Sequence, residues 1–289
     1  MHKTGTVIKG IGGFYYVDLG EQVVECRARG RFRLDKASSP LVGDSVVIAP
    51  DDGYVLEIAP RKNSFIRPPI ANIDCMVIVA TVAHPVTDTF FIDKITAIAR
   101  FKGITPIICI NKTDIEDSEK LYGIYSAAGL NALKVSAETG QGIDLLKAFL
   151  HGKISAFAGH SGVGKSSLLN IICPKDDFEI GGLSEKIKRG RNTTRHTQLY
   201  ALEGGGFVAD TPGFSSFDIA MLDDITLDAL PGCFDEFEPH LGECRYTSCS
   251  HTKEAGCAVL AAMEQGQVPQ LRHASYVKLY EQIKDIKKY

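Results

Sequence analysis

The chain has 289 residues, and 44% of them are hydrophobic, which is enough for two or three ordinary packed domains. Its formal net charge of −3 excludes a uniformly basic nucleic-acid binder, so a nucleic acid would have to be bound by local patches. The chain starts without the apolar run of a signal peptide and has no stretch near the ~20 apolar residues of a membrane span. These features predict a cytoplasmic protein with no membrane partner.

The first 66 residues alternate apolar and polar side chains in the manner of β-strands. Turn signals of Gly, Pro or Asp bound five short runs, at residues 6–8, 14–19, 23–29, 45–49 and 54–58. Five short strands in about 60 residues predict a small closed all-β barrel, of which the OB-fold fits best. We therefore expect an OB-fold domain over residues 1–66.

Four arginines alternate along one segment of this barrel: Arg27, Arg29, Arg31 and Arg33. Because strand side chains alternate between faces, a strand would carry several of them on one face, where they could bind RNA phosphates beside the rings of Phe32 or Tyr15. A solvated edge strand protected by its charge would have the same pattern. The segment alone leaves both interpretations open.

After a proline-containing linker at residues 67–69, the pattern changes to strands that alternate with helices. Strands are predicted at residues 74–81, 104–110, 132–135, 154–158, 198–202 and 206–209, and helices at 89–101, 118–128, 143–150 and 166–173. Repeated strand–helix units predict a mostly parallel sheet that binds its ligand at the carboxyl ends of the strands. We place this α/β domain at residues 67–222.

Residues 159–166 fit the phosphate-binding pattern G-x-x-x-x-G-K-[ST] between a predicted strand and a predicted helix. Its backbone N–H groups and the helix N-terminus would face the phosphates, Lys165 would add a full charge, and the Ser166 hydroxyl would bind Mg²⁺. The predicted nucleotide contacts are Gly159, His160, Ser161, Gly162, Val163, Gly164, Lys165, Ser166 and Ser167. A chance glycine-rich turn is the alternative for the loop taken by itself.

Two polar segments after this loop resemble the switches of GTPases. Asp210 begins a D-x-x-G match that ends at Gly213, so Asp210 would hold Mg²⁺ through water and the Gly213 N–H would sense the γ-phosphate. The loop at residues 190–196 would carry the Mg²⁺-binding threonine of the first switch, for which Thr194 is preferred over Thr193. The groups expected to act in catalysis are Lys165, Thr194 and Gly213.

Base recognition is predicted at two strand ends that precede the phosphate loop. Asn111, Lys112 and Asp114 belong to an N-K-x-D element, and Ser136 and Ala137 follow the next strand. In GTP-binding proteins with this element, the aspartate accepts from guanine, the lysine lies across the base and the alanine N–H meets O6. Adenine would leave the carboxylate without partners, a mismatch of roughly 10⁴-fold in comparable polar sites.

These elements stand in a circularly permuted order, because ordinary GTPases place the phosphate loop and switches before the base elements. Such a rearrangement requires only that the old termini can be joined and new ones opened in exposed loops. One consequence is that the chain after Gly213 is attached to the second switch, the segment that moves when the γ-phosphate is lost.

The C-terminal part, at residues 223–289, contains the ligand pattern Cys244-x4-Cys249-x-His251-x5-Cys257. Three sulfurs and one imidazole are typical of a structural Zn²⁺ site, and a disulfide pair is the alternative. Cys233 lies further off and is predicted to be a core residue. Apolar residues at helical spacing in residues 269–289 predict an amphipathic helix that packs on the zinc-binding unit.

Over essentially its whole length, the chain resembles the RsgA (YjeQ) family of circularly permuted GTPases in its barrel, its motif order and its Cys-Cys-His-Cys set. The resemblance implies GTP hydrolysis stimulated by the 30S ribosomal subunit, contact with 16S rRNA and a role in late 30S maturation. It also implies one structural Zn²⁺, and Mg²⁺ with GTP. We expect a monomer that binds GTP and GDP.

The catalytic loop departs from that family, whose members often carry a histidine immediately before the threonine pair. Here that position is Asn192, and His196 is a weaker substitute. Phe214 follows Gly213 where many GTPases place the glutamine that orients the attacking water. Two other functions fit parts of the pattern: a nucleic-acid-binding module with a structural nucleotide, and a permuted GTPase of large-subunit assembly.

Overall fold

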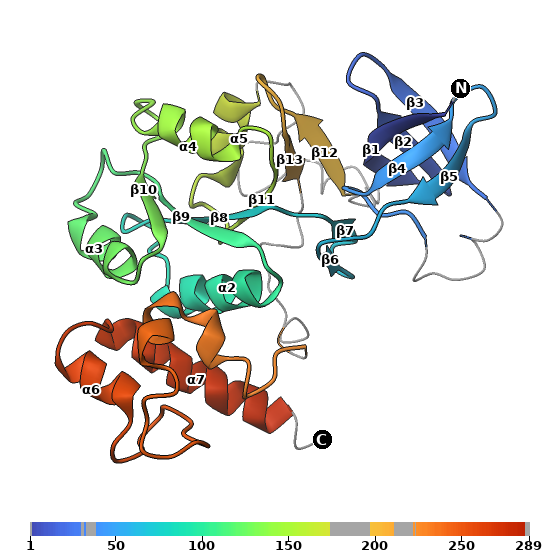
Figure 1. Cartoon of the computed structure of the whole chain (residues 1–289). Helices are drawn as coiled ribbons and strands as arrows, with labels where there is room; N and C mark the ends of the chain where they lie inside the picture. The colour runs from blue at the N-terminus through green and yellow to red at the C-terminus, as the bar shows by residue number, and fades with distance from the viewer. Residues whose placement is uncertain are drawn as a thin grey trace, which may run out of the picture.

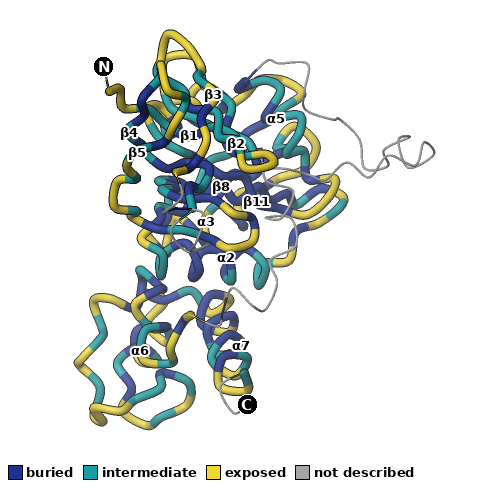
Figure 2. Tube along the Cα trace, turned by 90° about the vertical axis from the view of Figure 1, so that its right-hand side faces the viewer, coloured by how far each residue is buried: buried dark blue, intermediate teal, exposed yellow. Residues whose placement is uncertain are grey.

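The computed structural model describes residues 2–29, 32, 39–173, 197–210, 222 and 224–286. The described chain forms a barrel, a central α/β domain and a helical C-terminal unit, with the central domain between the other two (Figure 1, Figure 2). None of the helices in these ranges is long and apolar enough to cross a membrane.

The N-terminal domain is a five-stranded barrel, as the alternating pattern predicts. Its strands are β1 (Lys3–Ile11), β2 (Phe14–Asp18), β3 (Val23–Ala28), β4 (Ser45–Ala49) and β5 (Tyr54–Ile58). They pair in the order β1-β2-β3-β5-β4, and β4 pairs back with β1, so the barrel closes. The inward positions fill its core with Val7, Val17, Cys26, Ala28, Phe32, Val46, Ile48 and Val55. The OB-type barrel is therefore confirmed.

The segment predicted as a linker has defined structure. Strands β6 (Ser64–Phe65) and β7 (Ile70–Ala71) form a small hairpin that has residues 67–69 in its turn. The buried amide of Asn63 donates to the Ile73 oxygen at 2.8 Å and accepts from the Ile73 N–H at 3.0 Å. Because these two bonds satisfy buried backbone groups, the connection is held against the domain rather than extended in solvent.

The central domain is a sheet in the order β10-β9-β8-β11-β13-β12, parallel except for β12. Its strands are β8 (Cys75–Ala80), β9 (Thr105–Ile110), β10 (Asn131–Lys134), β11 (Ile154–Ala158), β12 (Gln198–Ala201) and β13 (Phe207–Asp210). Its helices are α2 (Thr89–Phe101), α3 (Glu119–Ala127), α4 (Ile143–Leu150) and α5 (Lys165–Ile172). The predicted mostly parallel sheet is confirmed.

Strand β8 shows why the sheet is covered on both faces. Every residue of β8 is buried, with Met76 and Ile78 in the core beneath α2 and α3, and Val77 and Val79 in the core beneath α4 and α5. Successive strand side chains point to opposite faces, so a continuous apolar run has to be covered twice.

The barrel and the central domain share one continuous sheet. Strand β1 pairs with β12 in antiparallel orientation, with Lys9 opposite Gln198. This pairing gives an eleven-stranded sheet that runs from β10 to β4. The sequence pattern contained no signal for it, because strand pairing between domains depends on tertiary position.

The C-terminal unit packs on α2, on the side of α2 that faces away from the central sheet (Figure 1). It contains the short 3-10 helices η5 (Pro231–Cys233) and η6 (Asp235–His240), followed by α6 (Ala258–Glu264) and α7 (Gln270–Ile286). The buried face of α7, with Tyr276, Leu279 and Ile283, belongs to the same core as α2. The predicted tail helix is confirmed, and it packs on the central domain as well as on the cysteine-containing loop.

Candidate nucleotide site and metal centre

The phosphate loop lies between β11 and α5, and three of its glycines have backbone angles that other residues rarely adopt. The φ values are 148° at Gly159, 84° at Gly162 and 97° at Gly164. A Cβ atom on Gly159 would lie 2.6 Å from the Val79 oxygen, and one on Gly164 would lie 2.2 Å from the Asn111 amide nitrogen. Only glycine fits these two positions, so the loop follows a path close to its neighbours.

Lys165, the first residue of α5, folds back over this loop. Its Nζ donates to the backbone oxygen of His160 at 2.8 Å and to that of Gly159 at 2.5 Å. Burial lowers the pKa of Lys165 to about 8. An anion placed against this ammonium would favour its charged form, and the N-terminus of α5 points partial positive charge at the same place.

Asn111, at the end of β9, joins the phosphate loop to the next strand end. Its buried side-chain amide donates to the Val163 oxygen at 2.9 Å and accepts from the Ala137 N–H at 3.1 Å. The structure thus brings together two segments that the sequence predicts separately. In this arrangement the Ala137 N–H, expected to meet guanine O6, is bonded to Asn111.

Lys112 and Asp114 follow on the same loop. Lys112 has a positive φ of 62°, which is uncommon for a residue with a side chain, and its Nζ donates to the His84 oxygen at 2.8 Å. The Asp114 carboxylate is exposed, whereas Ser136 is buried and its Oγ accepts from the Thr139 N–H at 3.1 Å. The side chain that would select guanine is therefore accessible to a ligand.

Asp210 is the last residue of β13, which pairs with β11 directly before the phosphate loop. Its backbone therefore ends at the same edge of the sheet as the loop, where the D-x-x-G match predicts it. The other predicted switch residues lie outside the described residues: Asn192, Thr193, Thr194, His196, Gly213 and Phe214.

The four predicted zinc ligands converge in the C-terminal unit, and their donor atoms all lie within 4.8 Å of one another. The Sγ atoms of Cys244 and Cys257 are 3.9 Å apart, and each lies 3.5 Å from Nδ1 of His251. A tetrahedral Zn²⁺ with ordinary bond lengths requires about 3.8 Å between sulfurs and about 3.6 Å between sulfur and nitrogen. Cys244, Cys249, His251 and Cys257 therefore fit Zn²⁺.

Hydrogen bonds from outside the ligand set hold this loop. The Ala258 N–H donates to Cys244 Sγ at 3.3 Å, and His273 and Tyr276 of α7 bond the backbone oxygens of residues 251 and 250 at 2.8 Å and 2.7 Å. Burial alone would raise the pKa of Glu254, but hydrogen bonds from Ser250 and the loop backbone lower it to about 2. Such outer contacts orient metal ligands.

Burial raises the pKa of Cys249 to about 12 and also raises the pKa of Cys257, while it lowers the pKa of His251. All three directions favour neutral groups in this pocket. Thiolate ligation therefore depends on the positive charge of a bound metal ion, which couples metal binding to proton release.

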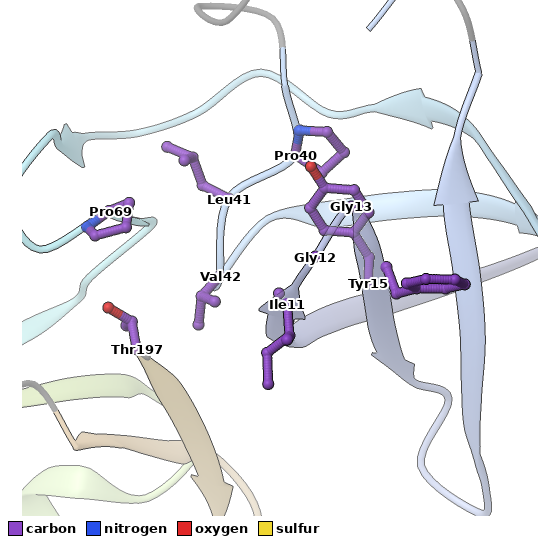
Figure 3. Close-up of a pocket in the computed structure, with 11 residues that line it drawn as sticks. Ile11, Gly12, Gly13, Tyr15, Pro40, Leu41, Val42, Pro69 and Thr197 are labelled. Carbon is purple, nitrogen blue, oxygen red and sulfur yellow. The ribbon is translucent and has the colours of Figure 1, made fainter. Parts of the chain in front are cut away.

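The arginine segment is partly described. Arg27 and Arg29 are exposed on the barrel, and the Arg27 guanidinium lies 4.5 Å from the ring centre of Phe14, whereas Arg31 and Arg33 lie outside the described residues. A separate feature of the barrel is a hollow that faces β12 and is lined by the hairpin of β1 and β2 (Figure 3). The labelled lining residues are Ile11, Gly12, Gly13, Tyr15, Pro40, Leu41, Val42, Pro69 and Thr197.

A parallel sheet with a phosphate loop, preceded in the chain by the predicted base-recognition elements, defines a circularly permuted P-loop nucleotide-binding protein. The chain matches the RsgA GTPase family over residues 58–220 and the RsgA N-terminal domain over residues 4–55. The chain belongs to the RsgA GTPase family, and its enzymatic activity is the hydrolysis of GTP. Mg²⁺ accompanies GTP in such enzymes.

Two curated relatives have the name small ribosomal subunit biogenesis GTPase RsgA. The relative from Caldanaerobacter subterraneus is 43% identical over 98% of this chain and 97% of its own length. The relative from Bacillus cereus is 41% identical over 98% of each chain. The similarity therefore extends through the barrel and the C-terminal unit.

Two solved structures have the same fold. YjeQ from Thermotoga maritima is 34% identical, with a TM-score of 0.82 over 98% of this chain and 99% of that chain. YloQ, described as a circularly permuted GTPase, is 37% identical, with a TM-score of 0.82 over 99% of this chain and 96% of that chain. The permuted connectivity is thus shared with known structures.

Proposed function

We propose that this protein is a cytoplasmic, monomeric GTPase that binds the 30S ribosomal subunit during its late maturation and hydrolyses GTP in response. The observation that supports the proposal is the link made by Asn111, whose side chain bonds the phosphate loop at Val163 and the predicted base-binding segment at Ala137. The relatives that match nearly the full chain are named small ribosomal subunit biogenesis GTPases, and this supports a role in small-subunit biogenesis.

In this proposal the nucleotide lies along the carboxyl edge of the sheet. Residues 159–167 contact the phosphates, and Asp114, Lys112, Ser136 and Ala137 form the guanine site. Ser166, Thr194 and Asp210 would hold Mg²⁺, which neutralises charge on the phosphates when bound. Lys165, Thr194 and the Gly213 N–H would act on the γ-phosphate. Cys244, Cys249, His251 and Cys257 would hold one structural Zn²⁺.

The proposed domains are residues 1–66, 67–222 and 223–289, with 16S rRNA bound by the barrel. Arg27 and Arg29 are exposed on adjacent outward positions, and Arg31 and Arg33 would continue the same basic segment. Such a cluster supplies local positive charge on a chain with a net charge of −3.

Hydrolysis by the free protein should be slow because the sequence does not place a water-orienting glutamine directly after the D-x-x-G match. Phe214 occupies the usual glutamine position, and an apolar ring neither positions water nor moves a proton. A partner that completes a GTPase site can raise the rate of hydrolysis roughly 10³–10⁵-fold. In this proposal the 30S particle is that partner.

The experiment is cosedimentation with purified 30S, 50S and 70S particles in the presence of GTP or GDP, together with single-turnover hydrolysis. The proposal expects GTP-dependent binding and rate stimulation by 30S alone. Equal stimulation by 50S would favour large-subunit assembly, and absence of turnover under all conditions would favour a structural nucleotide.

The RNA contact is tested with Arg27→Glu combined with Arg29→Glu. Binding to 30S should weaken, and its salt dependence should flatten by about one unit of slope for each lost phosphate contact. Lys120→Glu, an exposed charge change on α3, is the matched control. An unchanged slope would favour the alternative in which the arginines only protect an edge strand.

A further inference from the structure

Helix α2 lies between the central sheet and the C-terminal unit (Figure 1). Side chains of its first turn contact both the phosphate loop and α7. On one side, the Phe91 ring packs against the imidazole of His160 in the phosphate loop, with ring centres 3.9 Å apart and planes inclined by 35°. On the other side, Nζ of Lys278 on α7 lies 3.8 Å from the ring centre of Phe90. Consecutive phenylalanines thus contact two different units.

A buried ion cluster fixes the next residues of α2 to the C-terminal unit. Arg272 of α7 donates to Asp93 of α2 at 2.8 Å and to Glu236 of η6 at 2.7 Å, and all three side chains are at most 2% exposed. The same guanidinium lies 4.6 Å from the ring centre of Phe234. Separation of these groups would leave charges unpaired in the core, so α2 and α7 are held in one relative position.

The described phosphate loop is restrained at separate points, among them the buried Val163 side chain and the Lys165 ammonium. Its three glycines with positive φ give it more conformational freedom than other residues would, and Asn111 restrains one part through Val163. The segment before α2 adds support on the other part, where a Cβ on Gly162 would lie 3.2 Å from the Pro85 ring. The Phe91–His160 contact belongs to this second support.

We propose that Phe91 is a positioning residue for the phosphate loop, and that the C-terminal unit holds Phe91 in place through the Arg272 ion cluster. The inference rests on the proposed nucleotide site and adds a route by which it is regulated. Docking of the C-terminal unit on α2 raises nucleotide affinity, because the loop then loses less conformational freedom when phosphate binds.

Linkage makes this coupling reciprocal, so bound nucleotide strengthens the docking of the C-terminal unit by the same factor. A partner that contacts the zinc-binding loop would then influence the phosphate loop without touching it. The physical connection is short: Phe91 and Asp93 lie two residues apart on α2 and face different neighbours.

The test measures binding of a fluorescent GDP analogue to variants of the full chain. Phe91→Leu keeps an apolar side chain but loses the ring, and we expect binding to weaken about two- to twelvefold, with restoration by Phe91→Tyr. Arg272→Met should also weaken binding, and it should add nothing further in the Phe91→Leu background. A purely structural role would give additive losses and no rescue by tyrosine.

Lys102→Met is the matched control, because its pair with the exposed Asp224 of the C-terminal segment adds little to docking and lies at the other end of α2, away from the phosphate loop. Its GDP affinity should equal that of the wild type. Where circular dichroism shows that Arg272→Met has lost its C-terminal helix, Lys278→Met replaces it, with about a twofold loss expected.

Unchanged affinity in Phe91→Leu, or additivity with Arg272→Met or its replacement, would overturn the inference. Failure of the wild-type protein to bind the analogue would instead overturn the proposed nucleotide site. The two failures are therefore distinguishable in one titration series.

Discussion

The side-chain amide of Asn111 donates to the backbone oxygen of Val163 at 2.9 Å, and it does so from a side chain that is 1% exposed. Its oxygen accepts from the N–H of Ala137 at 3.1 Å. One residue therefore satisfies two backbone groups from separate loops, and it sets the distance between the places where phosphate and base would bind.

Asn111→Ala should weaken GDP binding about tenfold or more, because the Val163 oxygen loses its donor and the two loops lose their link. Isothermal titration calorimetry measures the effect. Asn131→Ala, on the neighbouring strand β10, is the control and should bind normally. Normal GDP affinity in Asn111→Ala would contradict the proposed role of the link.

Asp114→Asn should change the preferred base from guanine to xanthine. The amide presents a donor where the carboxylate accepted, so it pairs with the additional oxygen of xanthine and leaves guanine mismatched. Competition between GDP and XDP for a fluorescent GDP analogue measures the change. Glu116→Gln alters an exposed carboxylate of the same loop and should retain guanine preference. Retained preference in Asp114→Asn would contradict the assignment.

Nucleotide affinity should decrease as the pH rises above neutrality. Burial lowers the pKa of Lys165 to about 8, whereas bound phosphate favours the ammonium, so binding takes up a proton when the free lysine is neutral. With a pKa of about 8, the fraction of nucleotide-free protein whose Lys165 is charged falls about fourfold between pH 7 and 8.5. The GDP affinity should fall by the same factor. Calorimetry in two buffers of different ionisation enthalpy measures the proton uptake. A constant affinity without proton uptake would contradict it.

Purified protein should contain one zinc ion per chain, and Cys249→Ser should lose it. Because the ligand loop is organised by the metal, this variant should lose the fold of residues 244–257. Nucleotide binding should persist, weakened no more than in Phe91→Leu, since the nucleotide site itself is in another domain. Metal analysis and limited proteolysis measure both effects.

Cys233→Ala is the control for the zinc prediction, because Cys233 is buried in η5 and lies outside the ligand cluster. It should retain the metal. Purified wild-type protein with disulfide-bonded thiols and no zinc would favour the alternative that the spacing alone left open.

Local patterns were sufficient for much of this protein. The phosphate loop, the N-K-x-D element and the cysteine-histidine spacing each lie within a few residues, and backbone geometry restricts what such short segments can do. Alternation in the first 66 residues predicted the barrel for the same reason, since the strand period of two places every second side chain inside. The family resemblance connected these parts into one enzyme.

Only the tertiary structure could decide how distant segments meet. Arg272 and Asp93 are 179 residues apart, and Asn111 and Val163 are 52 apart, so no local period relates them. The pairing of Lys9 with Gln198 likewise joins two domains through backbone groups that carry no side-chain signature. Side-chain patterns determine which faces are buried, whereas the choice of partner across a buried face depends on the packing of the whole chain.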